Sequence, residues 1–78
     1  MNDVWEIYGM RRFLKLSQHK FAEQIGCSRS TVNDIENLRR NPSDSFLISF
    51  NRVFMPLKTR EFYIFLEDLK KIVNKYPI

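Results

Sequence analysis

The chain has 78 residues, 44 % of them hydrophobic and 14 % aromatic, which is enough for one compact core in one small domain. One cysteine and one histidine exclude an internal disulfide and a Cys/His zinc site, so we expect no metal. The longest unbroken apolar run, residues 62–66, is far too short to cross a bilayer.

The net charge of +4 comes entirely from the N-terminal half of the chain. Between residues 11 and 40 there are seven Lys or Arg against three Asp or Glu, whereas six basic and six acidic residues balance elsewhere. This basic window is typical of a surface that binds a polyanion, although many solvated surfaces are mildly basic too. The charged, mixed N-terminus is unlike a signal peptide, and a reducing cytoplasm is the expected location.

The first predicted helix begins near Val4, where Asp3 and Glu6 have the spacing of a capping box. Its inward face is predicted from helical spacing to be Ile7, Met10, Arg11 and Leu14. Trp5 and Phe13 fall outside that face and are expected to be surplus apolar surface.

Two short helices follow, separated by a tight turn. Ser17 is a good N-cap for a helix over Gln18–Ile25, and Gly26 ends it because glycine adopts the left-handed conformation easily. Ser28 can cap a third helix that runs from Arg29 to about residue 37, with Val32 and Ile35 facing inward.

Two longer helices complete the chain. Ser43 or Asp44 caps the fourth, which Pro56 ends, and Thr59 caps a fifth that is predicted to reach about Lys75. The buried positions expected on the fourth are Phe46, Leu47, Phe50, Val53 and Phe54. Those expected on the fifth are Phe62, Phe65, Leu66, Leu69, Ile72, Val73 and Tyr76. No stretch favours a strand.

The stretch from Gln18 to Ile35 has a steric logic. Ala22 is small where two crossing helices approach, Gly26 makes the turn, and apolar positions lock the second helix onto the first. With its flanks, this pattern resembles the Cro/repressor-type, or XRE-like, helix-turn-helix family from Ile7 to about Phe54. The supporting residues are Arg11, Leu16-Ser17-Gln18, Phe21-Ala22, Ile25-Gly26, Ser28-Arg29-Ser30-Thr31-Val32, Ile35-Glu36 and Arg40-Asn41-Pro42.

The resemblance implies an all-α, compact, five-helix domain of the lambda-repressor type spanning residues 1–78. Its helix-turn-helix DNA-binding core would occupy about 4–56, and a C-terminal helix over about 58–76 would complete the core and form a dimer interface. The resemblance also implies an ion pair between Arg11 and Glu36, and a buried guanidinium does need a carboxylate. A surface role for either residue is the alternative. Leu38 stands where the family often has glycine, and Asn37 is expected to take the left-handed conformation instead.

The predicted DNA contacts lie on and around the third helix, which reads bases with its outward face. The residues expected to contact bases are Arg29, Ser30, Thr31, Asn33 and Asp34. Those expected to contact the DNA backbone are Ser17, Gln18, Arg39, Arg40, Asn41 and Ser43. The alternative for each is an ordinary solvated side chain.

We therefore expect a sequence-specific regulator of transcription, a repressor or controller protein, that binds double-stranded DNA as a homodimer on a near-palindromic operator. The residues expected at the dimer interface are Phe62, Tyr63, Phe65, Leu66 and Leu69. The alternative is an antitoxin or other protein-interaction module with secondary DNA binding. No nucleophile and base are paired, so we expect no enzyme and no cofactor, and the charges do not segregate as membrane binding requires.

Overall fold

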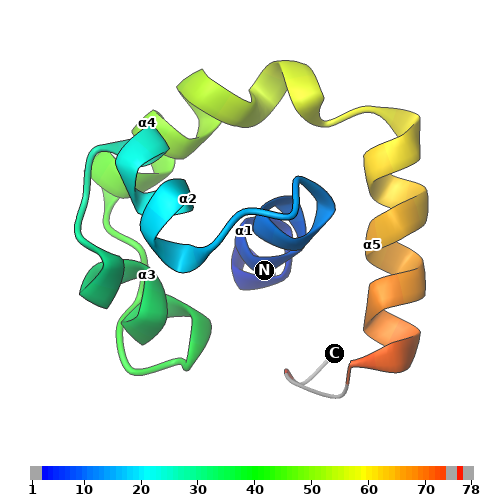
Figure 1. Cartoon of the computed structure of the whole chain (residues 1–78), viewed down its shortest axis with the longest axis horizontal. Coiled ribbons are helices and arrows are strands. Elements are labelled where there is room, and N and C mark those ends of the chain that lie inside the picture. The colour runs from blue at the N-terminus through cyan, green and yellow to red at the C-terminus, as the bar shows by residue number, and fades with distance from the viewer. Residues whose placement is uncertain (1–2, 74–75, 77–78) are drawn as a thin grey trace.

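The computed structural model describes residues 3–73 and 76, which form five α-helices and one 3-10 turn with no strand among them. The elements are α1 (Asp3–Phe13), α2 (Gln18–Ile25), α3 (Arg29–Glu36), α4 (Asp44–Phe54), η1 (Met55–Leu57) and α5 (Arg60–Ile72). In Figure 1, α1 runs through the middle of the molecule, α2 to α4 surround it on the left and top, and α5 stands on the right. The predicted all-α fold is confirmed.

Four of the helices begin at a hydroxyl side chain that accepts a hydrogen bond from the backbone. Ser17, Ser28 and Ser43 each accept from the N–H group three residues on, at 3.1 Å, and Thr59 does so at 3.3 Å. Such caps satisfy one of the backbone donors that a helix start leaves unpaired. The predicted caps are confirmed, and Ser43 rather than Asp44 caps α4.

Three helices end in a residue with left-handed backbone geometry. Gly26 has φ 90° at the end of α2, as predicted. The prediction for α3 was wrong, because Asn37 has φ −101° and Leu38, one residue later, has φ 60°. Lys15, after α1, has φ 57°. The left-handed region is unfavourable for residues with a Cβ, so Lys15 and Leu38 carry local strain that Gly26 avoids.

Gly9 allows α1 and α5 to approach closely. A Cβ atom placed on Gly9 would lie 2.5 Å from Leu66 Cδ1 and 3.7 Å from the ring of Phe62. Any larger residue would therefore push α5 away from α1. The role of Gly9 has no local signature in the sequence, because the contact joins two helices that lie far apart in the chain.

The core contains two residues that had been expected at the surface. Trp5 is 1 % exposed and packs edge-to-face on Tyr76, with 4.9 Å between ring centroids. Phe13 is half-buried against Phe62 and Phe65, at centroid distances of 5.6 and 5.3 Å. The expectation was wrong because the first helix is covered on two sides, by α3 and by α5, rather than on one.

The ends of the outer helices also differ from expectation. The first helix begins at Asp3, and the side chain that would form the predicted capping box with Glu6 lies outside the described part. The last helix ends at Ile72, and Val73 is extended with φ −102° and ψ 112°, so α5 is shorter than predicted. Ile72 is 80 % exposed rather than buried, while Tyr76 is buried without being part of the helix.

Lys58 ties the start of the molecule to its second half. Its ammonium group lies 2.9 Å from the carboxylate of Glu6 and 3.0 Å from the side-chain oxygen of Asn51. The same group lies 5.1 Å above the ring of Phe50. A lysine with these three partners links α1 to α4 just before α5 begins.

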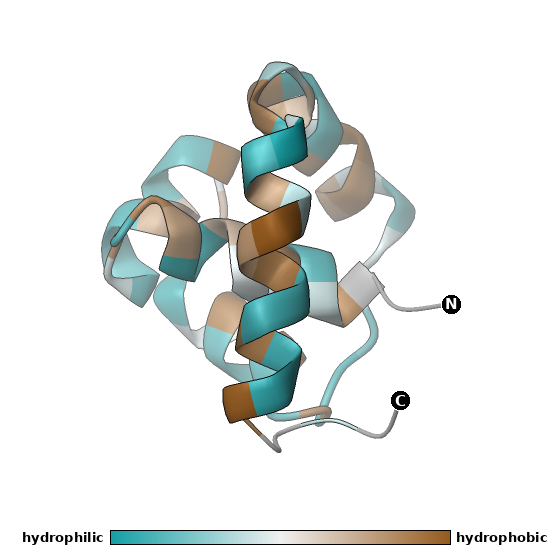
Figure 2. Cartoon of the chain, turned by 90° about the vertical axis from the view of Figure 1, so that its right-hand side faces the viewer, coloured by the Kyte–Doolittle hydropathy of each residue, from teal (hydrophilic) through white to brown (hydrophobic). Residues whose placement is uncertain are grey.

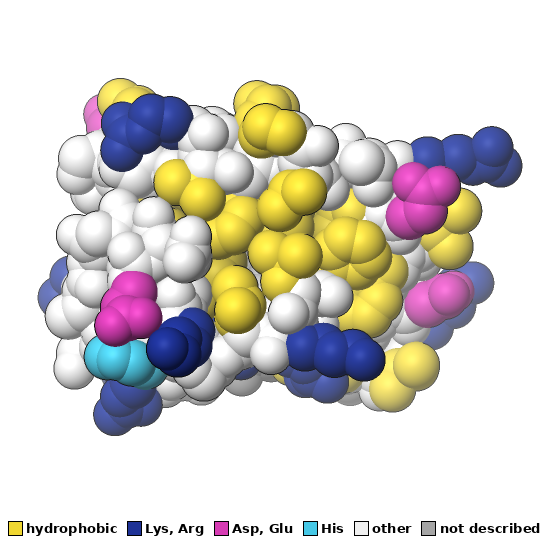
Figure 3. All heavy atoms as spheres, turned by 45° about the horizontal axis from the view of Figure 1, so that its top comes forward, with side chains coloured by type: hydrophobic (Ala, Val, Ile, Leu, Met, Phe, Trp, Pro, Cys, Tyr) yellow, Lys and Arg dark blue, Asp and Glu magenta, His cyan; other side chains and the backbone are white. Residues whose placement is uncertain are grey.

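Several apolar side chains remain exposed around α4, η1 and α5. Figure 2, with α5 in front, shows hydrophobic positions on the outer side of this helix, between hydrophilic ones. Figure 3 shows apolar side chains gathered in the middle of one face, with charged side chains at its edges. The large exposed apolar residues are Leu38, Ile48, Met55, Leu57, Tyr63, Ile64 and Ile72.

Replacing Leu38 by glycine should stabilise the protein, because glycine adopts φ 60° without the strain of a Cβ atom. The expected gain is roughly 1 kcal/mol in the free energy of unfolding, measured by urea titration. Lys15→Gly is the matched variant at the end of α1 and should give a gain of the same sign. A loss of stability in Leu38→Gly would mean that the exposed leucine makes contacts that outweigh its strain.

Candidate nucleic-acid interface

The inner face of α3 is fixed to the rest of the molecule by apolar packing. Val32 and Ile35 are fully buried, and Ala22 of α2 is 1 % exposed where the two helices contact each other. Phe21 of α2 stacks on Phe54 of α4 with ring centroids 5.1 Å apart, which holds the pair of helices on the core. The opposite face of α3 is thereby left to solvent.

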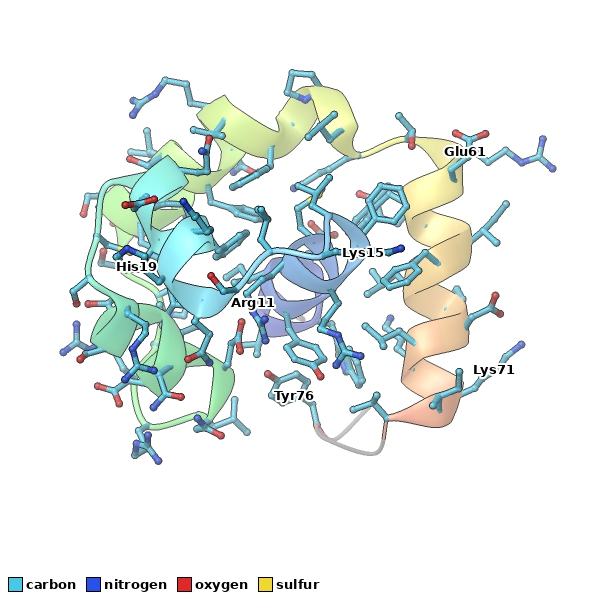
Figure 4. The ribbon with its side chains drawn as sticks, in the orientation of Figure 1. Arg11, Lys15, His19, Glu61, Lys71 and Tyr76 are labelled. Carbon is cyan, nitrogen blue, oxygen red and sulfur yellow. The ribbon has the colours of Figure 1, made fainter. Side chains whose placement is uncertain are left out.

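A buried ion pair joins α1 to the end of α3. Glu36 is 2 % exposed, and the Arg11 guanidinium donates to it twice, from Nε at 2.6 Å and from Nη2 at 3.0 Å. Arg11 also donates from Nη1 to the carbonyl of Leu16 at 3.0 Å. The structure thus contains the ion pair that the resemblance implied, in the two-pronged geometry that suits arginine. Figure 4 shows Arg11 lying between α1 and α3.

Gln18 connects this buried pair to the outer face of α3. Its side-chain nitrogen donates to Glu36 Oε1 at 3.0 Å and to Asn33 Oδ1 at 3.3 Å. Its side-chain oxygen accepts from Arg29 Nη1 at 3.3 Å. In the free protein this side chain lies along α3, and the expected contact of Gln18 with the DNA backbone stays a prediction.

A row of polar side chains lies along the outer face of α3 and continues one residue past its end, namely Arg29, Asn33 and Asn37, spaced four residues apart. Asn37 Nδ2 donates to Asn33 Oδ1 at 3.1 Å and to the Asn33 carbonyl at 2.8 Å. Amide and guanidinium groups of this kind form paired hydrogen bonds with base edges in the major groove. Asn37 was expected only to end the helix, although its spacing from Arg29 and Asn33 could have placed it in this row.

The other predicted base contacts are arranged differently. Ser30 is exposed, whereas Asp34 forms an ion pair with Arg39 at 3.2 Å. Thr31 is half-buried, its hydroxyl contacts Ser28 at 3.0 Å, and it lines a shallow hollow between α3 and the start of α4. Thr31 therefore lies on a different side of α3 from the polar row.

The predicted backbone contacts surround α3. Arg40 and Asn41 are exposed in the loop that follows it, and Arg40 Nη1 reaches back to Thr31 Oγ1 at 3.3 Å. The hydroxyls of Ser17 and Ser43 are engaged as helix caps, at the starts of α2 and α4. The start of α4 and Arg40 thus lie near Thr31, whereas the start of α2 lies near the polar row through Gln18.

Neither His19 nor Cys27 joins this arrangement. His19 is exposed on α2 and lies 3.2 Å from Glu23. Cys27 is half-buried. Burial raises the pKa of its thiol, so a smaller fraction of it is present as the reactive thiolate. Within the described ranges, 3–73 and 76, no three His, Cys, Asp or Glu side chains gather as metal ligands would.

Comparison with known proteins identifies the central part of the chain. A family model described as helix-turn-helix matches residues 10–54, more than half of the chain, and this span includes α2, α3 and α4. No curated protein and no solved structure gives a significant match. None of the helices in the described part has the length and apolar character that crossing a membrane requires.

Removing the buried arginine should destabilise the protein strongly, because Arg11→Met leaves the Glu36 carboxylate without its charged partner. The expected loss is about 3–5 kcal/mol in the free energy of unfolding, measured by urea titration. The double variant Arg11→Met/Glu36→Met should lose less than the single variant, since it leaves no buried charge. Glu67→Gln, which removes a charge at an exposed ion pair, is the control and should change stability little. Equal losses in the single and double variants would contradict the argument.

Proposed function

The chain belongs to the XRE-type helix-turn-helix family of DNA-binding transcription regulators, and on that premise we propose that α3 enters the major groove of an operator. The observation that carries the proposal is the polar row of Arg29, Asn33 and Asn37 on the solvent face of a helix whose other face is locked into the core. A rigid helix with base-pairing groups on its free face is what direct readout needs.

The polar row suggests which bases are recognised. Arg29 is suited to donate two hydrogen bonds to guanine O6 and N7, and Asn33 to pair with adenine N6 and N7. In the free protein these groups bond to one another and to Gln18, so they are held near one arrangement before DNA arrives. Binding would exchange these internal bonds for bonds to bases. Ser30 is a further candidate for a base contact, because it is exposed on the same helix.

The residues around α3 are proposed to set its position on the duplex through phosphate contacts, which fix orientation without reading sequence. Arg39, Arg40 and Asn41 would contact phosphates on one side of the groove. The backbone N–H groups at the start of α4, beside Ser43, would do so on the same side, and those at the start of α2, beside Ser17 and Gln18, on the other. A protein held on its operator in this way blocks the same groove to others, which is the basis for proposing a repressor or controller.

Arg29→Ala should weaken binding to the operator about 5- to 150-fold, corresponding to roughly 1–3 kcal/mol, and relax the preference at one base pair. Arg40→Ala should weaken operator and random DNA alike and reduce the slope of affinity against salt by about one. The operator is found first by selecting bound sequences from random DNA, and affinities are then measured by fluorescence anisotropy at several salt concentrations.

Lys71→Ala, on α5 and away from the polar row, is the control for the loss of one positive charge and should bind as the wild type does. If Arg29→Ala bound operator and random DNA as tightly as the wild type, α3 would not be the reading helix.

The two copies of a homodimer are proposed to meet through the outer face of α5. Of the residues expected there, Phe62, Leu66 and Leu69 are buried in the chain's own core and have no surface to offer. Tyr63 is 41 % exposed, and Phe65 is half-buried. The interface would therefore be narrower than the sequence suggested.

Ile64 is the natural centre of such an interface, because it is 52 % exposed in the middle of α5. In an antiparallel pair of α5 helices centred on Ile64, Arg60 of one copy faces Asp68 of the partner subunit, since each lies four residues from the centre. Opposite charges would then flank the apolar contact on both sides of the twofold axis. For both α3 helices to enter the major groove on one side of the duplex, this packing must place them about one DNA turn apart.

Ile64→Glu should shift the protein toward the monomer, because it places two carboxylates at the centre of the proposed interface. Sedimentation velocity over a range of concentrations measures the change, and Ile48→Glu, at an exposed isoleucine on α4, is the matched control. Arg60→Asp should also weaken the dimer, and adding Asp68→Arg should restore it.

A wild-type protein that is monomeric both in solution and on the selected operator would contradict the homodimer. The exposed apolar residues of α5 would then favour the second candidate, an antitoxin or other interaction module that covers this face with a different protein.

A further inference from the structure

The carbonyl groups at the C-terminal end of α3 receive hydrogen bonds from near and distant parts of the chain. The last carbonyls of a helix have no partners within it and must find them elsewhere. The Asn33 carbonyl accepts from the Asn37 N–H at 3.0 Å. The carbonyls of Asp34 and Ile35 accept from the N–H groups of Arg39 and Leu38, at 2.8 and 3.1 Å, in the pattern that a left-handed residue after a helix produces.

The carbonyl of Glu36 receives its hydrogen bond from much farther along the chain. The hydroxyl of Tyr76 donates to it at 2.6 Å, across 40 positions of sequence. Tyr76 lies beyond α5 and outside the 10–54 span that the family model matches. The last turn of the reading helix is therefore completed by a residue that is not part of the helix-turn-helix motif.

Tyr76 is itself held firmly by α1. It is 6 % exposed, and its ring packs edge-to-face on Trp5 and Tyr8, with centroid distances of 4.9 and 5.8 Å. Burial, and then the nearby Glu36 carboxylate, raise the pKa of Tyr76, so its hydroxyl stays protonated and able to donate. Figure 4 shows Tyr76 between α1 and the end of α3, on the same side of α1 as Arg11.

These contacts fix Glu36 at two points. Arg11 holds its carboxylate, and Tyr76 holds its carbonyl, and both are positioned by α1. Glu36 is the last residue of α3, and Asn37 of the polar row and the loop with Arg39 and Arg40 follow it directly. A shift of the Glu36 carbonyl would therefore move the residues that are proposed to contact the bases and the phosphates.

We propose that Tyr76 is a positioning residue for DNA recognition, whose hydroxyl caps the C-terminal end of α3 and sets the path of the loop behind it. This inference rests on the proposed function of α3. It makes Tyr76, which lies beyond α5 and outside the matched span, part of the DNA-reading unit.

The test compares the full chain with Tyr76→Phe, which keeps the ring in its aromatic cluster and removes only the donor. Operator affinity should fall roughly three- to tenfold, the range expected for one hydrogen bond, and affinity for random DNA should fall less, because it depends on the phosphate contacts of the loop but on no base contacts. Thr59→Ala removes one hydrogen bond at another helix end, the cap of α5 away from α3, and should bind as the wild type does. Thermal unfolding followed by circular dichroism first establishes a temperature at which all three proteins are folded. Urea titration at that temperature gives their free energies of unfolding.

Amide hydrogen exchange of the free proteins supplies a second measurement that needs no DNA. In Tyr76→Phe the amides of residues 37–41 should exchange faster, while those of α4 and α5 should keep their rates. A uniform acceleration, or equal affinity losses in Tyr76→Phe and Thr59→Ala, would overturn the proposal, and so would an unchanged operator affinity. If the wild type selected no DNA sequence, the proposed function would fail, and the exchange rates alone would decide whether Tyr76 fixes the end of α3.

Discussion

The buried carboxylate of Glu36 is the constraint around which the molecule is arranged. A charge that is only 2 % exposed must be paired and hydrogen-bonded, or the cost of removing it from water is not offset. Its partners come from α1 through Arg11, from the start of α2 through Gln18 and, at the backbone carbonyl, from Tyr76. Three distant segments must therefore meet at one residue, and that residue ends α3. Such a pair contributes less to net stability than to specifying one arrangement.

Gln18 couples this buried arrangement to the surface. Because its amide contacts both Glu36 and Asn33, the side chains on the outer face of α3 take their positions from the ion pair beneath them. Arg29 is held by the same amide through its oxygen. Supporting residues of this kind limit the conformations that a reading side chain must give up on binding. A change at the buried pair should therefore be felt in sequence preference as well as in stability.

Local sequence signals predicted most of this fold, because helix caps and the period of apolar residues act over a few residues. The hydroxyl caps, the turn at Gly26 and the inward positions of α3 were all recognisable in this way. Contacts between distant segments were not: neither the close approach at Gly9 nor the hydrogen bond from Tyr76 leaves a local pattern. Leu38 shows a third limit, since intrinsic preference favoured Asn37 for the left-handed position and the hydrogen bonds at the end of α3 place it one residue later.

The aromatic residues of the core also bear on how two copies could associate. Trp5 and Tyr76 complete the core within one chain, and the α5 residues Phe62, Leu66 and Leu69 are buried in the same core. The outer face of α5 is left with few apolar side chains, so an interface built on it would be small and its affinity modest. Two weakly associating copies gain most of their joint affinity when both bind one DNA molecule, because the second then binds at a high effective concentration. A dimer formed through α5 should thus assemble largely on its operator. The spacing and symmetry of the two half-sites would then determine whether two copies bind together.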